Sequence, residues 1–329
     1  MATIAMVDFD FDDCDFERAM VETAGIEFTS FSHGRHCTAD EIIAHAAGAD
    51  GIITSYGRFT AEVIAALPAA RVISKTGTGV DNIDVAAATA GGIAVCNVPA
   101  YGTEVVSDHA IALALACLRR INEIDADMRA GVWDFARRRP LGQVRGRTFA
   151  VVGYGNIGRA TAVKAAALGF SVVVWDRHGQ PGTLTAEGFP HLAFDEALRT
   201  ADVVSFHTAL TPETRHLLNA DNIALLGPGA IVVNTSRGAV IDTDAVAAAL
   251  EAGRLWGAGI DVFETEPVPA DAAIMRAPHT VLTAHAAYWS EESAVELRQR
   301  CTQNAIDVVL GRTPEACVNP AVLPRALAK

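Results

Sequence analysis

A glycine-rich turn between a strand-like run and a helix-like run constrains this chain more than any other feature. The apolar run 149–152 precedes the turn and the Ala-rich run 159–168 follows it. The turn has the spacing G-x-G-x-x-G and comprises Gly153, Gly155, Asn156, Ile157 and Gly158. Such glycines permit a tight turn, a close approach of the backbone to a pyrophosphate and close helix packing, and the helix N-terminus supplies amide donors. The order of strand, turn and helix therefore predicts a dinucleotide site, although the spacing alone also occurs in ordinary turns.

An acidic residue stands at the end of the next strand-like run. The run 172–175 leads to Asp176, where a carboxylate accepts hydrogen bonds from the adenosine ribose. A 2'-phosphate at this place would meet a like charge, so the sequence predicts NAD, bound as NAD⁺ or NADH, in preference to NADP. The neighbouring Arg177 would soften that repulsion if its side chain turned inward.

Short apolar runs alternate with Ala-rich helical stretches in two series. The first series spans residues 3–99, and the second begins at Thr148. The second continues through the strand-like runs 172–175, 203–207, 231–234, 257–262 and 281–283. This alternation predicts βαβ units, and 329 residues suit two domains of ordinary size. We expect an α/β chain made of two doubly wound parallel-sheet domains.

Two long helical patterns, 104–120 and 290–310, separate or follow these series. The first is a candidate interdomain helix. A Pro-punctuated ending, 313–324, follows the second, and we expect it to return to the first domain. The predicted domains are a discontinuous substrate-binding domain of residues 1–99 and 291–329 and a nucleotide-binding domain of residues 100–290.

Composition narrows the classes of partner and location. The net charge of -13 disfavours nucleic acid and anionic membranes, which attract basic surfaces, so a small anionic ligand needs a local cationic site. The N-terminus lacks a basic segment followed by an apolar one, and no long apolar run spans a bilayer, so we expect a cytoplasmic protein. Six scattered cysteines without a CxxC pair indicate reduced thiols, and no metal site is expected.

Three polar segments follow strand-like runs late in the chain. They are 234–238 with Thr235 and Arg237, 259–267 with Asp261 and Glu266, and 282–288 with His285 and Tyr288. Ligands of open α/β sheets bind beyond the carboxyl ends of the strands, so we expect the three segments to converge on one site. Taken singly, His285 would suit a core position, Glu266 a solvated loop and Arg237 a surface ion pair. His207, His216 and His279 lack such context and are expected to be structural.

With the glycine turn, these segments resemble the D-isomer-specific 2-hydroxyacid dehydrogenase family, and the similarity runs from residues 77–84 to His285. The resemblance implies a Rossmann NAD-binding domain inserted in a flavodoxin-like substrate domain. It also implies hydride transfer between nicotinamide and a small 2-oxo or 2-hydroxy acid. In that reaction His285 is the general acid/base, Glu266 is its partner, and Arg237 holds the substrate carboxylate and polarises its carbonyl.

The residue types suit these implied roles. Reduction of a 2-oxo acid needs a proton at the carbonyl oxygen, and a histidine titrating near neutrality is suited to give it. A carboxylate beside that histidine favours imidazolium. Arginine donates in a planar fork to carboxylate and carbonyl oxygens together and stays charged throughout.

The resemblance implies further contacts. For the cofactor, it places Asp261 near the nicotinamide carboxamide, Thr235 beside the ring through its backbone, and the loop from Thr208 to Thr214 over the cofactor. For the substrate, it implies that the backbone amides of the turn Gly77, Thr78 and Gly79 bind the carboxylate. Lys75, just before this turn, would bind the carboxylate or a second anionic group, or would be a surface lysine. A homodimer through the nucleotide domain, involving the helix from Glu104 and the segment 133–135, is also expected.

The segment 284–293 is similar to the branch that contains the C-terminal binding protein corepressors, in which a tryptophan that packs on substrate stands where this chain has Tyr288. Ala284 replaces the usual proline before the histidine, and Ala286 and Ala287 replace a glycine-rich continuation. An NAD-sensing regulator and a phosphoglycerate or phosphite dehydrogenase therefore stay open as alternatives. Formate oxidation is disfavoured, because glutamine would be expected in place of Glu266.

Overall fold

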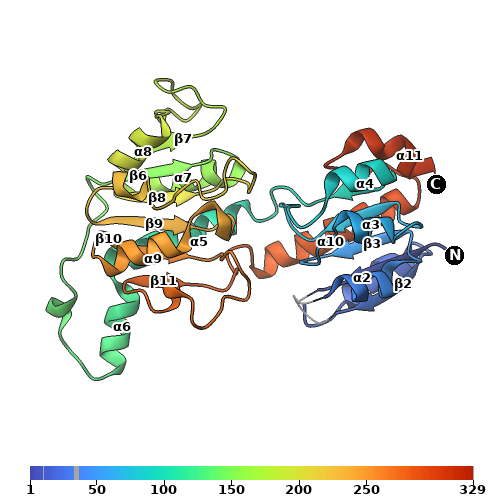
Figure 1. Cartoon of the computed structure of the whole chain (residues 1–329), viewed down its shortest axis with the longest axis horizontal. Helices are drawn as coiled ribbons and strands as arrows, with labels where there is room; N and C mark the ends of the chain where they lie inside the picture. The colour runs from blue at the N-terminus through green and yellow to red at the C-terminus, as the bar shows by residue number, and fades with distance from the viewer. Residues whose placement is uncertain (10, 33–36, 329) are drawn as a thin grey trace. The chain divides into compact units, whose positions relative to one another are not determined.

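The computed structural model describes residues 1–9, 11–32 and 37–328, which form two compact units (Figure 1). Unit 1 consists of Met1–Tyr101 and Ser290–Lys329, and unit 2 of Gly102–Trp289. Both are built on parallel sheets with helices on both faces, as the alternating sequence pattern predicts. Within the described residues, no helix combines the length and apolar character needed to cross a membrane.

Unit 1 has a five-stranded sheet of order β2-β1-β3-β4-β5, in which every pairing is parallel. Its strands are β1 (Thr3–Val7), β2 (Glu27–Phe31), β3 (Gly51–Thr54), β4 (Val72–Lys75) and β5 (Ala94–Cys96). Its helices are α1 (Asp15–Thr23), α2 (Ala39–Ala46), α3 (Ala61–Ala65), α4 (Val85–Gly91), α10 (Glu291–Val309) and α11 (Leu323–Ala328), with the 3₁₀ turn η5 (Pro320–Val322). This strand order is the flavodoxin-like one, so the expectation for this part of the chain is confirmed.

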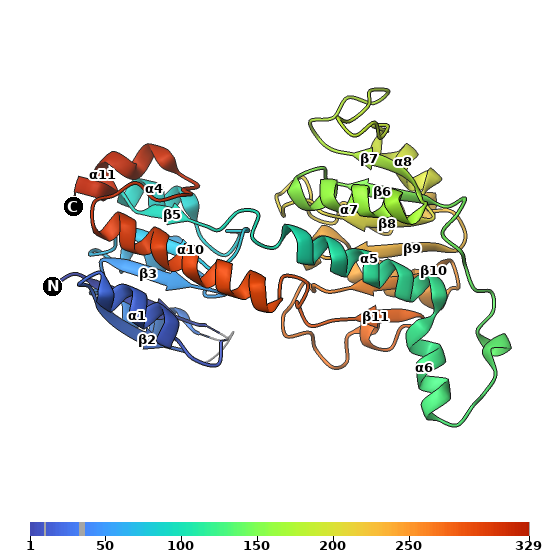
Figure 2. The ribbon, with the colours of Figure 1, turned by 180° about the vertical axis from the view of Figure 1, so that it is seen from behind.

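The two faces of this sheet carry different helices. Helices α2, α3 and α4 cover one face, and α1 and α10 cover the other (Figures 1 and 2). Ile52 and Ile73 are fully buried under the helices of the first face. A sheet that is covered on both sides needs apolar residues along each strand. Helix α10 begins with a capping box in which Ser290 accepts from the Ser293 amide.

Arg71 ties the C-terminal end of the chain to the start of β4. Its buried guanidinium donates to the backbone oxygens of Val309 at 2.8 Å, Ala326 at 2.9 Å and Leu327 at 3.2 Å. These oxygens lie at the ends of α10 and α11, where helices leave carbonyls without intrahelical partners. The Pro-punctuated ending predicted for 313–324 is irregular up to η5, and α11 begins at Leu323. Pro324 lies in its first turn, where a missing N–H costs no hydrogen bond.

Unit 2 has a six-stranded parallel sheet of order β11-β10-β9-β8-β6-β7. The strands are β6 (Thr148–Val152), β7 (Ser171–Trp175), β8 (Val203–Phe206), β9 (Ala230–Asn234), β10 (Leu255–Ile260) and β11 (Thr280–Leu282). The helices are α5 (Thr103–Arg119), α6 (Ile121–Arg129), α7 (Asn156–Leu168), α8 (Phe194–Thr200) and α9 (Thr243–Glu251). The 3₁₀ turns are η1 (Phe135–Arg138), η2 (Ile223–Leu225), η3 (Gly238–Val240) and η4 (Ala273–Met275).

Beyond β7, His191 forms a single parallel bridge with Val174, and the Leu192 amide donates to the Val174 oxygen at 2.9 Å. Counting this short segment as a strand gives the order 3-2-1-4-5-6 from His191 to β10, which is that of a Rossmann domain. Helices α5 and α7 cover one face and α8 and α9 the other (Figures 1 and 2). In such a sheet the strand order reverses between β6 and β8, and ligands bind beyond the carboxyl ends of the strands at that point.

Candidate active site

Three adjacent strands of unit 2 bring the predicted chemical residues to one edge of the sheet. Ile260 at the end of β10 is paired with Asn234 at the end of β9 and with Leu282 at the end of β11. The segments that carry Arg237, Glu266 and His285 follow these strand ends. Because parallel strands end at the same edge, the three segments start side by side.

His285 and Glu266 form a direct pair. The Nδ1 atom of His285 lies 2.7 Å from Oε2 of Glu266, and each side chain is 22% exposed. The second carboxylate oxygen, Oε1, accepts from the backbone amide of Phe263 at 2.9 Å, which fixes the carboxylate in its own loop. A histidine bound at Nδ1 by a carboxylate presents Nε2 for proton exchange, and the carboxylate orients the ring and stabilises its charged form.

The backbone at His285 is strained. Its φ is +53°, a left-handed conformation that residues other than glycine adopt at a cost of roughly 1–3 kcal/mol. A short network holds it there. The His285 amide donates to the Asp261 backbone oxygen at 2.7 Å, and Asp261 follows β10 directly. The conformation of the histidine therefore depends on the end of a buried strand.

The side chain of Asp261 holds the loop around His285 through hydrogen bonds to residues on both sides of the histidine. Its carboxylate is buried, and Oδ1 accepts from the Ala286 amide at 2.9 Å and from the Thr283 hydroxyl at 2.5 Å. Its Oδ2 accepts from the Ala287 amide at 3.0 Å. The sequence did not indicate this positioning role of Asp261, for which it predicted a cofactor contact.

His109 on α5 extends this network and was not selected from the sequence. Its Nε2 lies 3.0 Å from the Thr283 hydroxyl and 3.6 Å from Oδ1 of Asp261. A single histidine within a helical pattern gives no sign of such a contact, because the two partners are 174 positions apart in the sequence. The sequence signal available is that Asp261 and Thr283 both lie at the ends of strand-like runs.

Arg237 lies in the loop after β9, against the loop that carries Glu266. Its Nη1 donates to the Ser236 oxygen at 2.8 Å, and the Asn234 side chain donates to the Arg237 oxygen at 2.9 Å. The next residue, Gly238, packs so closely that an added Cβ would collide with the backbone of Phe263. The arginine loop and the glutamate loop are therefore in backbone contact, which requires glycine at position 238.

The glycine turn has the geometry expected for binding a pyrophosphate. Gly153 has a φ of +95°, and an added Cβ at Gly158 would collide with the Gly153 oxygen, so both positions need glycine for the fold itself. An added Cβ at Gly155 would meet nothing within 4 Å, and this residue precedes Asn156 and Ile157 in the first turn of α7. Gly155 thus keeps the approach to the helix N-terminus open.

Two threonine hydroxyls, one beside this turn and one in the loop after β9, have a property that fits a bound cofactor. An added Cβ on Gly153 would lie 2.8 Å from the Thr208 side chain, which places Thr208 beside the turn. The hydroxyls of Thr208 and of Thr235 are buried and make no hydrogen bond to any residue that the structure describes. Buried polar atoms normally have partners, so these two fit a ligand with polar groups. The Thr214 hydroxyl instead donates to the Ala209 oxygen at 2.6 Å and stabilises its own loop.

Asp176 lies directly after β7. Burial opposes its ionisation, but hydrogen bonds from the backbone amides of Tyr154 at 3.0 Å and His178 at 2.9 Å outweigh that effect and lower its pKa. The carboxylate is therefore charged at neutral pH and joined to the glycine turn through Tyr154. Arg177 is exposed, and its Nε lies 3.0 Å from the His178 ring.

Histidines outside the pair have structural partners. His216 lies 2.9 Å from Glu264, and His279 lies 2.8 Å from Glu123. Loss of contact with water lowers the pKa of His207 to about 3, and Ser205 lies 2.9 Å from its ring. A neutral His207 cannot serve as a general acid near pH 7.

Tyr288 packs on the catalytic histidine. Its ring lies 5.9 Å from the His285 imidazole in an edge-on orientation.

Unit 1 carries the remaining predicted residues. Lys75 is 9% exposed, and its Nζ donates to the Thr76 oxygen at 2.9 Å, so it is not a surface lysine. An added Cβ on Gly77 would lie 3.1 Å from this Nζ, which places the ammonium group over the predicted turn. Hydrogen bonds hold the turn to the segment after β5: the Val98 amide donates to Gly77, and the Thr78 hydroxyl donates to Val98. Gly79 follows in the same turn.

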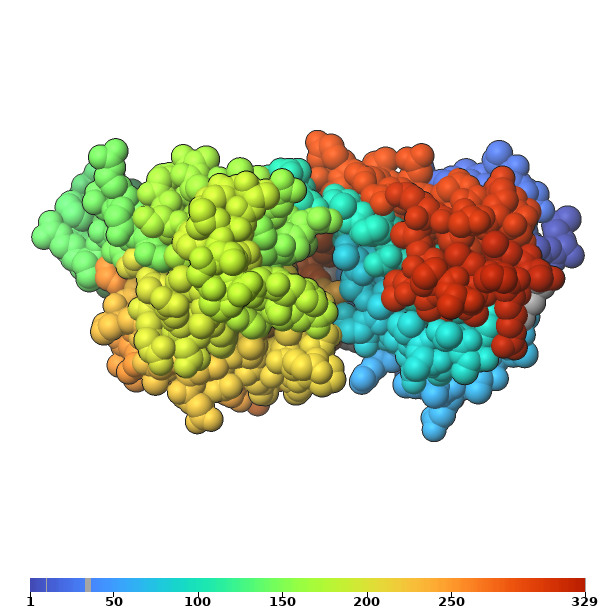
Figure 3. Space-filling model, turned by 90° about the horizontal axis from the view of Figure 1, so that it is seen from above, coloured from blue at the N-terminus to red at the C-terminus, as the bar shows by residue number. Residues whose placement is uncertain are grey.

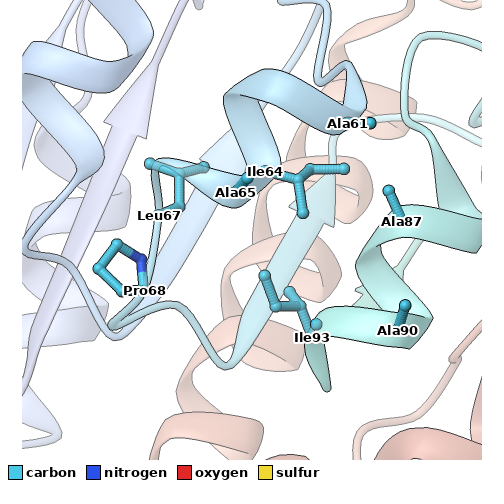
Figure 4. A pocket seen from close by; sticks show the side chains of 9 residues that line it. Ala61, Ile64, Ala65, Leu67, Pro68, Ala87, Ala90 and Ile93 are labelled. Atoms are coloured by element: carbon cyan, nitrogen blue, oxygen red, sulfur yellow. The ribbon is translucent and has the colours of Figure 1, made fainter.

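An apolar cavity of about 360 Å³ lies elsewhere in unit 1, between α3 and α4 (Figure 4). Ile64, Leu67 and Ile93 line it, together with small residues of the two helices. It contains no predicted site residue. Across the described part of the chain, no three His, Cys, Asp or Glu side chains are arranged to hold a metal ion.

Comparison with known proteins assigns the chain to a family. Residues 111–287 match the family described as D-isomer specific 2-hydroxyacid dehydrogenase, NAD binding domain. The glyoxylate reductase of Korarchaeum cryptofilum (strain OPF8) is 38% identical over 266 residues, which cover 80% of each chain. The D-3-phosphoglycerate dehydrogenase of Mycobacterium leprae (strain TN) is 38% identical over 234 residues, which are 71% of this chain but 44% of that protein, so the match spans less than half of its length.

Solved structures agree with this assignment. The TT0316 protein of Thermus thermophilus superposes with a TM-score of 0.87 and 34% identity, over 96% of this chain and 99% of that chain. The fold thus indicates the same family of proteins as the glycine turn and the polar segments after the late strands. The chain belongs to the D-isomer specific 2-hydroxyacid dehydrogenase family, whose members are NAD-dependent oxidoreductases that act on CH–OH groups.

Proposed function

We propose that this chain is an NADH-dependent reductase of small 2-oxo acids, which also oxidises the corresponding D-2-hydroxy acids. The observation that carries the proposal is the 2.7 Å pair of His285 and Glu266, held at the sheet edge where the Arg237 loop lies against the Glu266 loop. This edge also holds Thr235, whose buried hydroxyl suits a cofactor. Two similar proteins, from Korarchaeum cryptofilum (strain OPF8) and Thermococcus litoralis, are named glyoxylate reductase, which favours a small oxo acid.

The residues divide the chemistry between binding and proton transfer. The glycine turn and Asp176 would hold NADH, which when bound would supply the hydride. Arg237 binds the substrate carboxylate and draws electron density from the carbonyl. His285, charged in the reductive direction, gives a proton from Nε2 to the forming alkoxide, while Glu266 holds Nδ1 and stabilises the charged ring. In the oxidative direction the neutral ring accepts the proton.

The substrate side of the proposal involves unit 1. We assign the carboxylate-binding amides to Thr78 and Gly79 of this turn, beside the Lys75 ammonium, because the Gly77 amide donates to the Lys75 oxygen at 2.9 Å. Lys75 would equally bind a second anionic group, as in a phosphorylated substrate. Tyr288 beside His285 provides an apolar contact for the substrate side chain.

A panel of substrates tests the reaction. NADH oxidation is measured with glyoxylate, hydroxypyruvate, pyruvate and larger 2-oxo acids, and NAD⁺ reduction with 3-phosphoglycerate and phosphite. Preference for an unphosphorylated oxo acid supports the proposal. Rapid oxidation of 3-phosphoglycerate or phosphite contradicts it. Tight NADH binding without turnover of any acid would favour an NAD-sensing regulator of the corepressor type, the alternative suggested by the segment 284–293.

Substitution of Glu266 tests the proton-transfer pair. Glu266→Gln keeps the shape of the side chain but removes the charge that favours imidazolium, so the alkaline limb of the pH profile of kcat for reduction should move to lower pH. His285→Ala should lower kcat by roughly two to four orders of magnitude with NADH still bound. Glu264→Gln is the matched control, because Glu264 contacts His216 instead. An unchanged profile at a near-normal rate in Glu266→Gln would leave Glu266 with a structural role only.

Asp261→Asn tests the positioning of His285. The asparagine side chain has one acceptor oxygen and one donor nitrogen. The backbone N–H of Ala286 or of Ala287 would therefore face a donor instead of an acceptor, and the strained loop would relax. A displaced catalytic group lowers kcat by roughly 10–100-fold. We expect that loss with an NADH dissociation constant changed by less than about threefold, and a smaller loss in Thr283→Val. Weak NADH binding with normal kcat would instead assign Asp261 to the nicotinamide alone.

Asp176→Ala tests the preference for NADH over NADPH. The native preference should be measurable as a ratio of kcat/KM values, because the carboxylate accepts from a ribose hydroxyl and repels a phosphate. Its loss should narrow that ratio by roughly one to two orders of magnitude. Arg177→Ala serves as the opposite control and should widen the ratio. Equal efficiency with both cofactors in the unaltered protein would remove the proposal.

We also propose that two copies associate through the α6 arm of unit 2, residues 121–138. Exposed apolar side chains gather on it, with Trp133 at 87% and Phe135 at 58% exposure, and Figure 3 shows the arm (green) protruding from its unit. Light scattering at micromolar concentration should give a dimer, and Trp133→Ser with Phe135→Ser should weaken it, because apolar area drives association. Leu184→Ser, 66% exposed elsewhere, is the control. A monomeric unaltered protein would contradict the proposal.

A further inference from the structure

Two cysteines that are far apart in the sequence lie opposite each other at the β5 edge of unit 1. The Val318 amide donates to the Val95 oxygen at 2.7 Å, and the Asn319 side chain accepts from the Val95 amide at 2.8 Å. Asn319 also donates to the Ile93 oxygen at 3.0 Å, so the segment runs back along β5 in the antiparallel direction. That direction places Cys317 opposite Cys96.

The two sulfur atoms interact. A hydrogen bond from the Cys96 thiol lowers the pKa of Cys317 to about 7 despite partial burial, and the same contact with burial raises the pKa of Cys96. The lowered pKa favours the thiolate form of Cys317, whereas Cys96 keeps its proton. The thiolate is the form of cysteine that attacks electrophiles.

Solvent exposure indicates that an oxidant reaches Cys317 first. Cys317 is half-buried, whereas Cys96 is fully buried. Nearby Cys301 is also fully buried, and burial raises its pKa to about 12, as it does for Cys117. Burial keeps the thiols of Cys301 and Cys117 out of reach of an oxidant dissolved in water. Cys37 is half-buried, like Cys317, and so serves as a natural control.

We propose that Cys96 and Cys317 form an oxidisable dithiol that reacts with hydrogen peroxide and closes to a disulfide. The Cys317 thiolate attacks one peroxide oxygen, the O–O bond breaks, and a sulfenic acid and hydroxide form. The Cys96 sulfur then attacks the Cys317 sulfur, an S–S bond forms, and the sulfenic oxygen leaves as water with the Cys96 proton. Overall, two thiols and one peroxide give one disulfide and two waters.

The disulfide would bind the C-terminal segment covalently to β5. At present that segment is held by hydrogen bonds from Val318 and Asn319 and by the Arg71 contacts to α11. A cross-link between residues so distant in sequence restricts the unfolded chain strongly. The unfolding midpoint of the oxidised protein should be higher by roughly 5–10 °C.

Peptide mapping of the full chain tests the proposal. The protein is treated with hydrogen peroxide at pH 7.5, alkylated and digested with trypsin without reduction. We expect peptides 76–119 and 313–325 to be linked, with fragment ions assigning Cys96 rather than Cys117, and dithiothreitol to separate them. Cys317→Ser should abolish the link and Cys37→Ser should leave it intact.

Cys96→Ala provides a second test that does not depend on the folding of Cys317→Ser. Without the Cys96 thiol, the Cys317 sulfenic acid should persist and be trapped by dimedone, and its formation should require a higher pH. Cys317 oxidised to sulfinic acid in the unaltered protein, with Cys96 still alkylated, would overturn the proposal. A Cys317 link to Cys301 or to a second chain would overturn it as well.

Discussion

The buried carboxylate of Asp261 is the interaction on which the candidate active site depends. A carboxylate removed from water is costly unless hydrogen bonds replace its hydration, and here Thr283, Ala286 and Ala287 supply three donors. Charge-assisted hydrogen bonds contribute about 1.5–3 kcal/mol each, whereas the left-handed backbone at His285 costs roughly 1–3 kcal/mol. The bonds outweigh the strain, so the loop keeps His285 in reach of Glu266.

Close backbone packing organises the rest of this edge. Gly238 brings the Arg237 loop against the Glu266 loop, and Gly153 brings the glycine turn against Thr208. In both places a side chain would force the loops apart, so small residues set the distances between polar groups. The geometry of the site therefore depends on glycines that take no part in the reaction themselves.

Much of the fold could be predicted from the periodicity of apolar residues and from the positions of glycine and proline. Strand-like runs and the glycine spacing predicted two parallel-sheet domains and a dinucleotide site, because these patterns are local in sequence. The third strand position of unit 2, by contrast, is reduced to one bridge at His191, and no periodic pattern marks it. Helix α11, which begins at Leu323, was not predicted, since Pro324 ends helices in most positions but is tolerated in a first turn.

The sequence by itself determined which residue types follow the strand ends, and hence the candidates Arg237, Glu266 and His285 and the acidic Asp176. Tertiary structure alone decided what these groups contact. It buried Lys75, gave Asp261 and His109 a role around Thr283, and set Cys317 against Cys96. The physical reason is that local sequence sets strand and turn chemistry, whereas contacts across hundreds of positions depend on sheet order and packing, which no short pattern encodes.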